Sequence, residues 1–147
     1  MITVAGDLAP VMTVAELEDF FDQAFPGRRA APDAVVVGLE AGWVRIRLTP
    51  DQQNLRPGAL VSGPTQMGLA DRAAYAVIIA HIGPVAMAVT SNLNYSFLRG
   101  VQLRDFHADA RLLKLGRRLA TVDVQLWQDQ PVNLVGQATV TYAIPDS

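Results

Sequence analysis

One carboxylate stands out because it interrupts an apolar helical run. After Pro64 the chain is predicted to be helical as far as His81, and most side chains there are Ala, Val, Ile, Leu or Met. A helix that is apolar on nearly all sides is a buried helix, and an ionised carboxylate inside one is costly unless it is paired or used. Arg72 cannot simply neutralise Asp71, because adjacent residues on a helix do not face each other. Asp71 is therefore either a structural carboxylate whose hydrogen bonds are satisfied or a catalytic carboxylate.

The start of the same helix offers backbone N–H groups that lack partners and lie at the positive end of the helix dipole. Gly63 has no side chain, so a substrate carbonyl could approach its N–H closely. Pro64 suits a first helical turn but has no N–H to donate. Ser62 is interpreted as an N-cap or as a substrate contact. Gly63 and Asp71 are separated along the helix by roughly 12 Å at 1.5 Å per residue, so one chain does not bring both to one carbonyl.

The composition narrows the possible functions. The chain has 147 residues, 50% of them hydrophobic, with a net charge of -2 and no cysteine. This length suits one domain with its own core. The balance of charge disfavours nucleic acid as a partner, and the lack of cysteine excludes disulfides and thiol nucleophiles. The two histidines are not spaced as ligands, so we expect no metal site. We expect no signal peptide and no membrane-spanning segment, and hence a cytoplasmic protein.

Helices and strands that could position these groups follow from the pattern. Residues 1–12 are interpreted as an arm. Thr13 and Glu16 form a capping-box signal for an extra N-terminal helix over Val14–Phe25, which Pro26 and Gly27 end. Hydrophobic residues on one face of this helix indicate that it packs against the rest of the domain.

The remaining segments alternate with a period of two and predict strands. A hairpin is expected over Ala34–Leu39 and Trp43–Leu48, and residues 50–58 are interpreted as a loop. A long strand, Val85–Phe97, follows the apolar helix, and a meander of three strands follows it: Phe106–Leu113, Leu119–Trp127 and Val132–Ile144. The predicted fold class is α+β, a single domain of residues 1–147 in which an antiparallel sheet wraps a long central helix.

Three motifs carry a resemblance to a known family. The first is the run from Gly58 to Asp71, where family members often have Asn-Pro-x-Gly-x-x-His-Gly-Gly and an acid nine residues after the His. The second is Ala88–Arg99, which is similar to a strand ending in Phe-Leu-Arg-Pro. The third is the hairpin from Ala108 to Ala120, with its Gly-Arg-Arg turn. Over residues 33–143 the sequence resembles the PaaI-like acyl-CoA thioesterases of the phenylacetic-acid-degradation group, which have the hot-dog fold.

The resemblance implies roles for particular residues. Asp71 matches the catalytic acid, which acts as general base or nucleophile. Gly63 matches the glycine whose N–H points at the thioester carbonyl, and Thr90 matches a hydroxyl that helps to place water. The resemblance implies that coenzyme A passes close to Arg99. Further candidates for substrate binding are Ser62, Pro64, Arg56, Asn92, Arg117 and Arg118.

The resemblance also implies an assembly. Because Gly63 and Asp71 are far apart within one chain, we expect a homodimer, or a homotetramer built from dimers, in which the acid of one subunit faces the glycine of the other. The expected function is hydrolysis of an acyl-CoA thioester to free acid and coenzyme A. Coenzyme A is then part of the substrate, and no separate cofactor, metal, nucleic acid or membrane is expected.

Three positions depart from the family pattern and keep an alternative open. Ser62 stands where the His is usual, Pro64 where the second Gly is usual, and Arg56 where the Asn before the proline is usual. These departures favour a rival interpretation, an acyl-CoA-binding or regulatory hot-dog protein with little or no turnover. A hydratase is disfavoured, since no His lies near the helix start.

Overall fold

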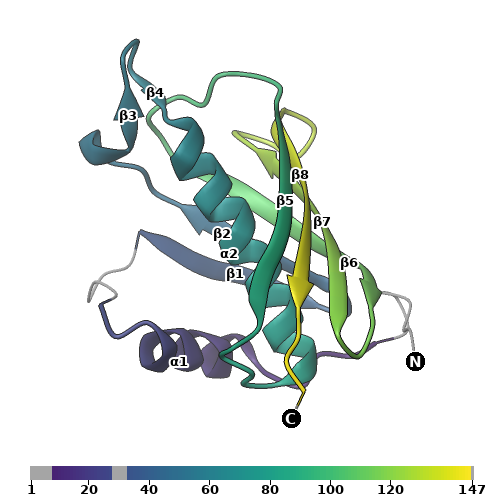
Figure 1. The fold of residues 1–147 in the computed structure, drawn as a ribbon. Coiled ribbons are helices and arrows are strands. Elements are labelled where there is room, and N and C mark those ends of the chain that lie inside the picture. The colour runs from purple at the N-terminus through teal and green to yellow at the C-terminus, as the bar shows by residue number, and fades with distance from the viewer. Residues whose placement is uncertain (1–7, 28–32, 147) are drawn as a thin grey trace.

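The computed structural model describes residues 8–27 and 33–146. In these ranges a long helix lies against a curved antiparallel sheet, and a shorter helix packs across one end (Figure 1). In chain order the elements are α1 (Val14–Ala24), β1 (Ala34–Glu40), β2 (Trp43–Leu48), a 3-10 turn (Gln52–Asn54), β3 (Leu55–Arg56), β4 (Leu60–Val61), α2 (Gly63–Ile82), β5 (Val89–Phe97), β6 (Phe106–Leu115), β7 (Leu119–Trp127) and β8 (Leu134–Ala143).

The central helix α2 begins and ends where its sequence predicts. The Ser62 side chain accepts a hydrogen bond from the Thr65 N–H as N-cap, and Gly83 ends the helix at a φ of 94°, which favours glycine. The whole stretch from residue 73 to 81 is buried. Residues 64, 67, 68, 71 and 72 instead form a stripe of exposed and half-buried positions along the first half of the helix. The prediction of a buried helix is thus right for its second half only.

The sheet curves around α2 and supplies most of the core. Its six strands have the order β1-β2-β6-β7-β8-β5, and every neighbouring pair is antiparallel. The predicted hairpin and the three-strand meander are confirmed. Alternate residues of β6, β7 and β8 face α2 and are buried, which gives the inside-outside pattern typical of an antiparallel sheet with one wet face.

The edge strand β5 is irregular near its beginning. It pairs with β8, and no strand pairs with its other edge within the described ranges. It is shorter than the predicted strand, because residues 84–88 form an irregular connection after α2. Its register shifts between Thr90 and Asn92, which is a β-bulge at Ser91. Thr90 lies opposite the buried Tyr142, whereas Asn92 lies opposite Thr141 on the outer face.

The short helix α1 closes one end of the molecule. Its predicted capping box between Thr13 and Glu16 is present, and it ends one residue earlier than predicted. Leu17 and Phe21 are fully buried against the core. Of the predicted arm, residues 1–7 lie outside the described residues. Residues 8–12 pack on α2, where the Val11 N–H donates to the Ala80 carbonyl.

Residues 50–58 contain more structure than the predicted loop. The 3-10 turn is capped by Asp51, and strands β3 and β4 form a two-stranded hairpin beside the start of α2. Gly58 and Ala59 both have positive φ at the tip of this hairpin. The predicted loop thus carries Arg56 to the N-terminal end of α2.

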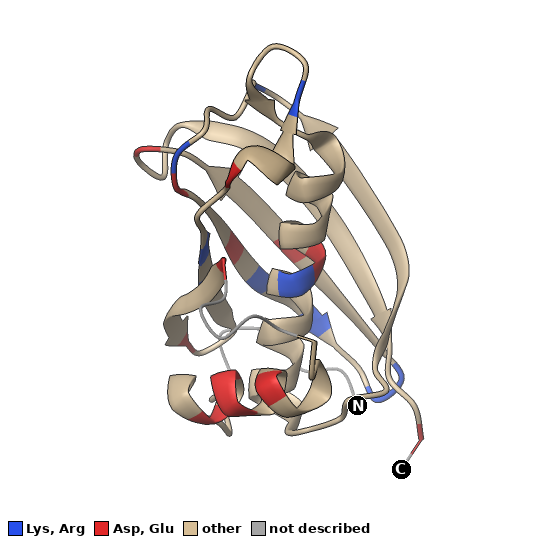
Figure 2. Cartoon of the chain, turned by 90° about the vertical axis from the view of Figure 1, so that its left-hand side faces the viewer, with Lys and Arg blue, Asp and Glu red and all other residues tan. Residues whose placement is uncertain are grey.

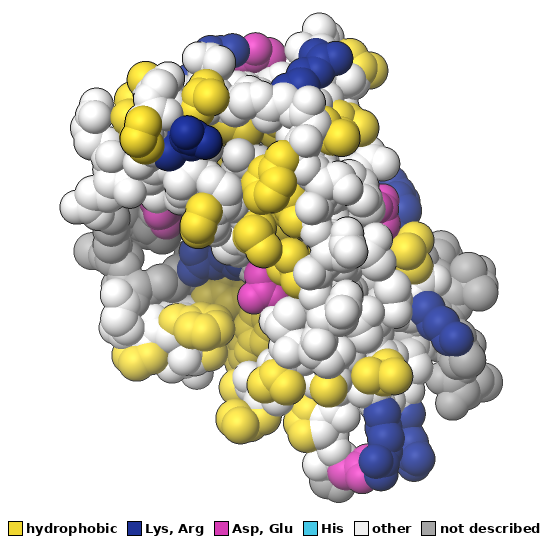
Figure 3. Space-filling model, turned by 45° about the horizontal axis from the view of Figure 1, so that its top comes forward, with side chains coloured by type: hydrophobic (Ala, Val, Ile, Leu, Met, Phe, Trp, Pro, Cys, Tyr) yellow, Lys and Arg dark blue, Asp and Glu magenta, His cyan; other side chains and the backbone are white. Residues whose placement is uncertain are grey.

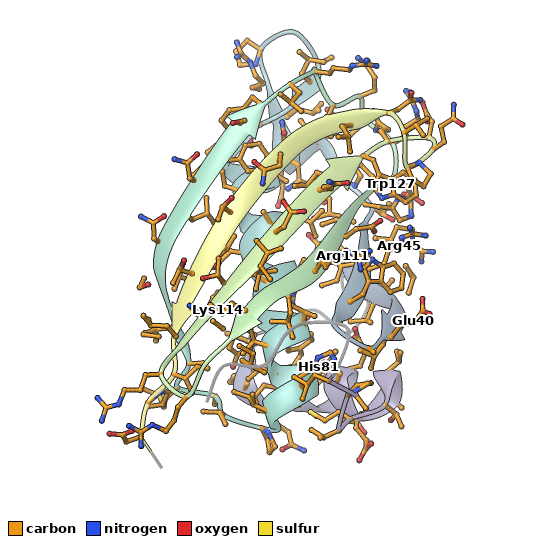
Figure 4. All side chains as sticks on the ribbon, turned by 90° about the vertical axis from the view of Figure 1, so that its right-hand side faces the viewer. Glu40, Arg45, His81, Arg111, Lys114 and Trp127 are labelled. Atoms are coloured by element: carbon orange, nitrogen blue, oxygen red, sulfur yellow. The ribbon has the colours of Figure 1, made fainter. Side chains whose placement is uncertain are left out.

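The outer face of the sheet carries charged and aromatic side chains in close contact. The Arg45 guanidinium lies 5.1 Å from the Trp43 ring centroid and 4.9 Å from that of Trp127, and it donates two hydrogen bonds to Asp109 at 2.7 and 2.9 Å (Figure 4). His107 stacks on Trp127 with its centroid 4.1 Å away. Stacked arginine is well suited to such a site, so this cluster ties strands β2, β6 and β7 together.

His81 joins the end of α2 to the turn between β1 and β2. Its Nε2 accepts from the Gly42 N–H at 2.9 Å, and its Nδ1 lies 2.7 Å from the Val77 carbonyl oxygen. This pair of contacts requires the neutral ring with the proton on Nδ1. Burial lowers the pKa of His81. The histidine is a buried structural bridge.

We predict that stability falls in mild acid because of this bridge. The pKa of His81 is lower in the folded chain than the ordinary value of 6.5, so below about pH 6.5 the unfolded chain binds a proton that the folded chain resists. The destabilisation is absent above that pH and grows as the pH falls, with a slope of up to about 1.4 kcal/mol per pH unit. Urea unfolding of wild type and His81→Gln from about pH 7.5 to about pH 5 measures this dependence.

His81→Gln should lower the free energy of unfolding even at about pH 7.5, because a flexible amide replaces the ring that joins the Gly42 N–H to the Val77 carbonyl oxygen in one fixed geometry. It should also flatten the pH dependence. His107→Gln measures the separate contribution of the other histidine, because burial lowers the pKa of His107 as well and the same linkage applies to it. An unchanged slope in His81→Gln would contradict the assignment.

Candidate functional site

The Asp71 carboxylate is held by two hydroxyl groups. Thr90 Oγ1 donates to Asp71 Oδ1 at 2.7 Å, and the Tyr142 hydroxyl donates to the same oxygen at 2.8 Å and lies 3.2 Å from the Asp71 carbonyl oxygen. No group among residues 8–27 and 33–146 donates to the other oxygen, Oδ2. The carboxylate is half-buried on the open stripe of α2. Its position is therefore fixed through one oxygen while the second remains for another partner.

Tyr142 is a member of this site that the sequence analysis missed. Burial raises the pKa of Tyr142 far above its ordinary value, and the neighbouring Asp71 acts in the same direction. The phenol therefore stays protonated and remains a donor to the carboxylate. Its alternation with Val140 and Ala138 places it on the inner face of β8, but only the sheet register brings it to Asp71.

A cavity opens beside this carboxylate. Its volume is about 570 Å³, within the range usual for sites that bind small molecules. Asp71, Arg72 and Thr90 lie on its wall, together with Gly68, Tyr75, Tyr142 and Phe25 from the end of α1. Figure 3 shows hydrophobic side chains gathered around a hollow on this face of the molecule. The acid thus lies beside a largely apolar recess.

The N-terminal end of α2 has one backbone donor left over. The Thr65 N–H is capped by Ser62 Oγ at 3.3 Å, the Gln66 N–H bonds to the Ser62 carbonyl at 3.2 Å, and Pro64 has no N–H. Within the described residues the N–H of Gly63 has no acceptor. This confirms that Ser62 is an N-cap. It also leaves Gly63 as the donor that the helix dipole favours for an anion.

A second groove, about 470 Å³ in volume, surrounds this donor. Arg56, Gly63 and Arg99 all line it, so three residues predicted separately from the sequence lie together. The Phe97 ring covers Gly63 so closely that a Cβ at residue 63 would lie 3.2–3.3 Å from its atoms. The groove therefore combines a free N–H with two exposed basic side chains.

A buried hydrogen-bond chain fixes the wall of this groove. The Tyr95 hydroxyl donates to Gln66 Oε1 at 2.8 Å, and Gln66 Nε2 donates to the Val61 carbonyl at 3.3 Å. Gly136 makes room for the tyrosine, because a Cβ there would lie 2.1 Å from the Tyr95 hydroxyl. The sequence analysis missed these two linked hydrogen bonds. A glutamine within an apolar helical run was the available signal.

The remaining predicted residues lie elsewhere. Asn92 was predicted to contact substrate, but the bulge at Ser91 places it on the outer face, away from Thr90 and both grooves. Arg117 and Arg118 lie at the turn between β6 and β7, where Arg118 pairs with Asp146. Arg117 lines a separate groove of about 710 Å³ beside the end of β8. Pro64 is exposed beside the second groove.

Within one chain the acid and the free N–H belong to two separate sites. Asp71 is tied to Thr90 near the beginning of β5, and Gly63 lies under Phe97 at its end. Asp71 lies eight residues after Gly63 in α2, which corresponds to roughly 12 Å along the helix. No group of three potential metal ligands is found in the part of the chain that the structure describes. Likewise, none of its described helices is long and apolar enough to cross a membrane.

The curved sheet around a central helix defines the hot-dog fold, and known thioesterases share it. The family description "Thioesterase superfamily" matches residues 58–135, more than half of the chain. This range contains Gly63, Asp71, Thr90 and Arg99. The chain therefore belongs to the thioesterase superfamily.

Solved structures agree with this assignment. A candidate thioesterase from Silicibacter sp. TM1040 is 36% identical, with 98% of this chain and 99% of that chain covered and a TM-score of 0.86. A phenylacetic acid degradation-related candidate thioesterase from Ralstonia eutropha JMP134 is 27% identical, over 85% and 98%, with a TM-score of 0.73. The smu.793 protein of Streptococcus mutans UA159, 22% identical over 81% and 94%, has a TM-score of 0.70. None of the curated proteins matches the chain. The predicted resemblance to PaaI-like proteins is confirmed.

Proposed function

We propose that the protein is an acyl-CoA thioesterase whose active site is completed by a second copy of the chain. The observation that carries the proposal is that the described chain holds two groups suited to thioester hydrolysis. They are the fixed carboxylate of Asp71 and the backbone N–H of Gly63, which has no acceptor. A thioester needs a donor where negative charge develops on its carbonyl oxygen and a base or nucleophile near its carbonyl carbon. The Streptococcus mutans neighbour, which shares the fold, is bound to acetyl-CoA.

The free edge of β5 supports a dimer built by strand pairing. An unpaired edge is a template for another strand, and a two-fold axis makes such a contact self-complementary. Antiparallel pairing of two β5 strands about their middle would place Thr90 of one subunit near the partner subunit's Phe97. That arrangement would bring Asp71 toward the partner's Gly63. The two distant parts of one chain then become neighbouring parts of one site.

The reaction follows from these positions. The Gly63 N–H stabilises the oxyanion, while Oδ2 of Asp71 takes a proton from a water that attacks the carbonyl carbon, or attacks that carbon itself. Thr90 and Tyr142 hold Oδ1 during either step. The C–S bond then breaks, the thiolate of coenzyme A takes up a proton, and water supplies the new carboxyl oxygen. The products are a free acid and coenzyme A.

The first prediction concerns Asp71. Asp71→Asn should reduce hydrolysis of acyl-CoA by about 100-fold or more, since the amide can neither accept the proton nor attack. Its side-chain oxygen can still accept from Thr90 and Tyr142, so the fold and acyl-CoA binding should persist. Thiol release from a panel of acyl-CoA substrates measures the rate, and Asp123→Asn on the outer face is the matched control. Unaltered turnover in Asp71→Asn would remove it from the mechanism.

The same panel tests the rival interpretation. If the wild-type protein binds acyl-CoA but releases thiol from none of the substrates, it is an acyl-CoA-binding hot-dog protein.

The second prediction concerns the donor and the shared site. Gly63→Pro removes the N–H, and the extended ψ of 155° at Ser62 already suits a residue that precedes proline. Activity should fall by about 100-fold or more. Gly63→Ala adds a comparable contact with Phe97 but keeps the N–H, so it separates loss of the donor from crowding. It should therefore retain more activity than Gly63→Pro.

Mixing the variants tests whether the site is shared. A heterodimer of Asp71→Asn and Gly63→Pro subunits has one site with both groups intact and one with both defects. Activity should return after co-expression, although each variant alone is inactive. Verified heterodimers that remain inactive would show that the acid and the donor are not shared. A monomeric mass at micromolar concentration in sedimentation would also count against the dimer.

The third prediction concerns coenzyme A. Arg56 and Arg99 line the groove beside Gly63, and arginine binds phosphate well. Arg99→Ala should raise the KM for acyl-CoA several-fold and leave the KM for an acyl-pantetheine thioester nearly unchanged, because that substrate lacks the nucleotide. Arg111→Ala, on the outer face, is the control. Equal effects on both substrates would argue against phosphate contact. The same comparison with Arg117→Ala and Arg118→Ala tests those predicted contacts.

A further inference from the structure

The cavity beside Asp71 extends well beyond the carboxylate. At about 570 Å³ it has room for much more than one thioester carbon, and it reaches from Asp71 and Thr90 to Phe25 at the end of α1. We infer that this cavity holds the acyl group of the substrate and that Phe25 closes its far end, so that α1 limits the length of acyl group accepted. The inference rests on the proposed function and adds the substrate class that the site prefers.

The walls of the cavity suit an apolar chain. Tyr75 and Tyr142 contribute aromatic surface, and their ring centroids lie 5.8 Å apart. Gly68, Ala86 and Ala88 are small, which leaves the space between α2 and β5 open. The Tyr75 hydroxyl donates to the Ala86 carbonyl at 3.1 Å, so this polar group is already satisfied. An apolar acyl group would gain free energy by leaving water for such a surface.

Phe25 is placed to close the cavity rather than to build the core. Phe21, one turn earlier, is 1% exposed and fixes α1 to the domain, whereas Phe25 is 47% exposed. The Phe25 ring meets Tyr75 edge-on with centroids 5.9 Å apart. Removing the ring should therefore open the end of the cavity while the contacts of Phe21 keep α1 in place.

Charge decides which end of the substrate lies near α1. This helix carries four acidic residues and no Lys or Arg. Figure 2 shows acidic residues in red along it. The carboxylates of α1 disfavour phosphate along that helix, and Arg72 is the one basic residue among the described residues that line the cavity, whereas Arg56 and Arg99 together line the other groove. The nucleotide end of an acyl-CoA is therefore favoured at the groove of Arg56 and Arg99. The uncharged acyl end is the part that can enter the cavity beneath it.

Two substitutions should change the acyl preference in opposite directions. Phe25→Ala lengthens the cavity. Gly68→Leu fills it, because a Cβ at residue 68 meets no atom within 4 Å and leucine favours helix over glycine. The measurement is kcat/KM for acetyl-, hexanoyl-, decanoyl- and palmitoyl-CoA. We expect the ratio of long to short substrates to rise about 10-fold in Phe25→Ala and to fall about 10-fold in Gly68→Leu.

A matched control separates this effect from loss of structure. Leu113→Ala removes an apolar side chain that is 51% exposed and lies outside both grooves. It should keep the wild-type chain-length profile. Because the readout is a ratio of substrates, a variant that merely lowers the fraction of folded protein does not change it. Thermal unfolding of each variant confirms that α1 remains packed.

The outcomes separate this inference from the proposed function. If the wild type hydrolyses acyl-CoA and both variants keep its profile, the cavity does not hold the acyl group, and the thioesterase proposal stands. If the wild type hydrolyses no acyl-CoA, the proposed activity fails. The dissociation constants of the same four ligands, measured by calorimetry, then decide the matter. A chain-length dependence that moves oppositely in Phe25→Ala and Gly68→Leu supports the cavity, and one that moves in neither variant overturns it.

Discussion

The enclosure of α2 determines where everything else can lie. The second half of this helix is buried on all sides, and much of it consists of alanine, as in Ala73, Ala74 and Ala76. Small residues let the curved sheet approach closely, and dense packing then leaves no room for water. Enclosure ends at the first half of the helix, where the stripe of residues from 64 to 72 reaches solvent. The residues of α2 that reach solvent lie there, and both candidate grooves include residues of that half.

A single strand links the two halves of the site. β5 carries Thr90 beside the acid at one end and Phe97 over the free N–H at the other. Its two ends are fixed by different contacts, Thr90 to Asp71 and Tyr95 to Gln66. A shift of the whole strand relative to α2 would therefore move both parts of the site together. In the proposed dimer the same strand also forms the contact between subunits, so assembly and chemistry depend on one element.

Local signals predicted the elements well, and contacts between distant segments were predicted poorly. The N-cap at Ser62, the capping box at Thr13 and the meander each depend on a few neighbouring residues, so period and turn residues suffice to find them. The hydrogen bond from Tyr142 to Asp71 depends on where β8 lies relative to α2. No local sequence pattern contains that information. The half-open stripe of α2 was missed for a similar reason: the pattern gives apolarity, but only the sheet decides which side stays uncovered.

The family resemblance supplied what local patterns could not. The apolar run and the helix start singled out Asp71 and Gly63, the motif then implied their roles, and the structure places each beside a groove. The placement of Asn92 on the face of Thr90 is wrong for a physical reason, since it assumed a strict period of two along residues 85–97. One extra residue in the strand reverses that relation.

The bulge at Ser91 changes which residues of β5 face inward: even-numbered Thr90 before it and odd-numbered residues after it. Before the bulge, Thr90 faces inward to the acid, and after it Leu93 and Tyr95 face inward to the core. Without the extra residue, any alignment that buried Leu93 and Tyr95 would turn the Thr90 hydroxyl outward. The inserted residue thus lets the sequence of the strand change on one side of Ser91 without constraining the other. Substitutions at the core positions Leu93 and Tyr95 can therefore accumulate without changing which way Thr90 faces.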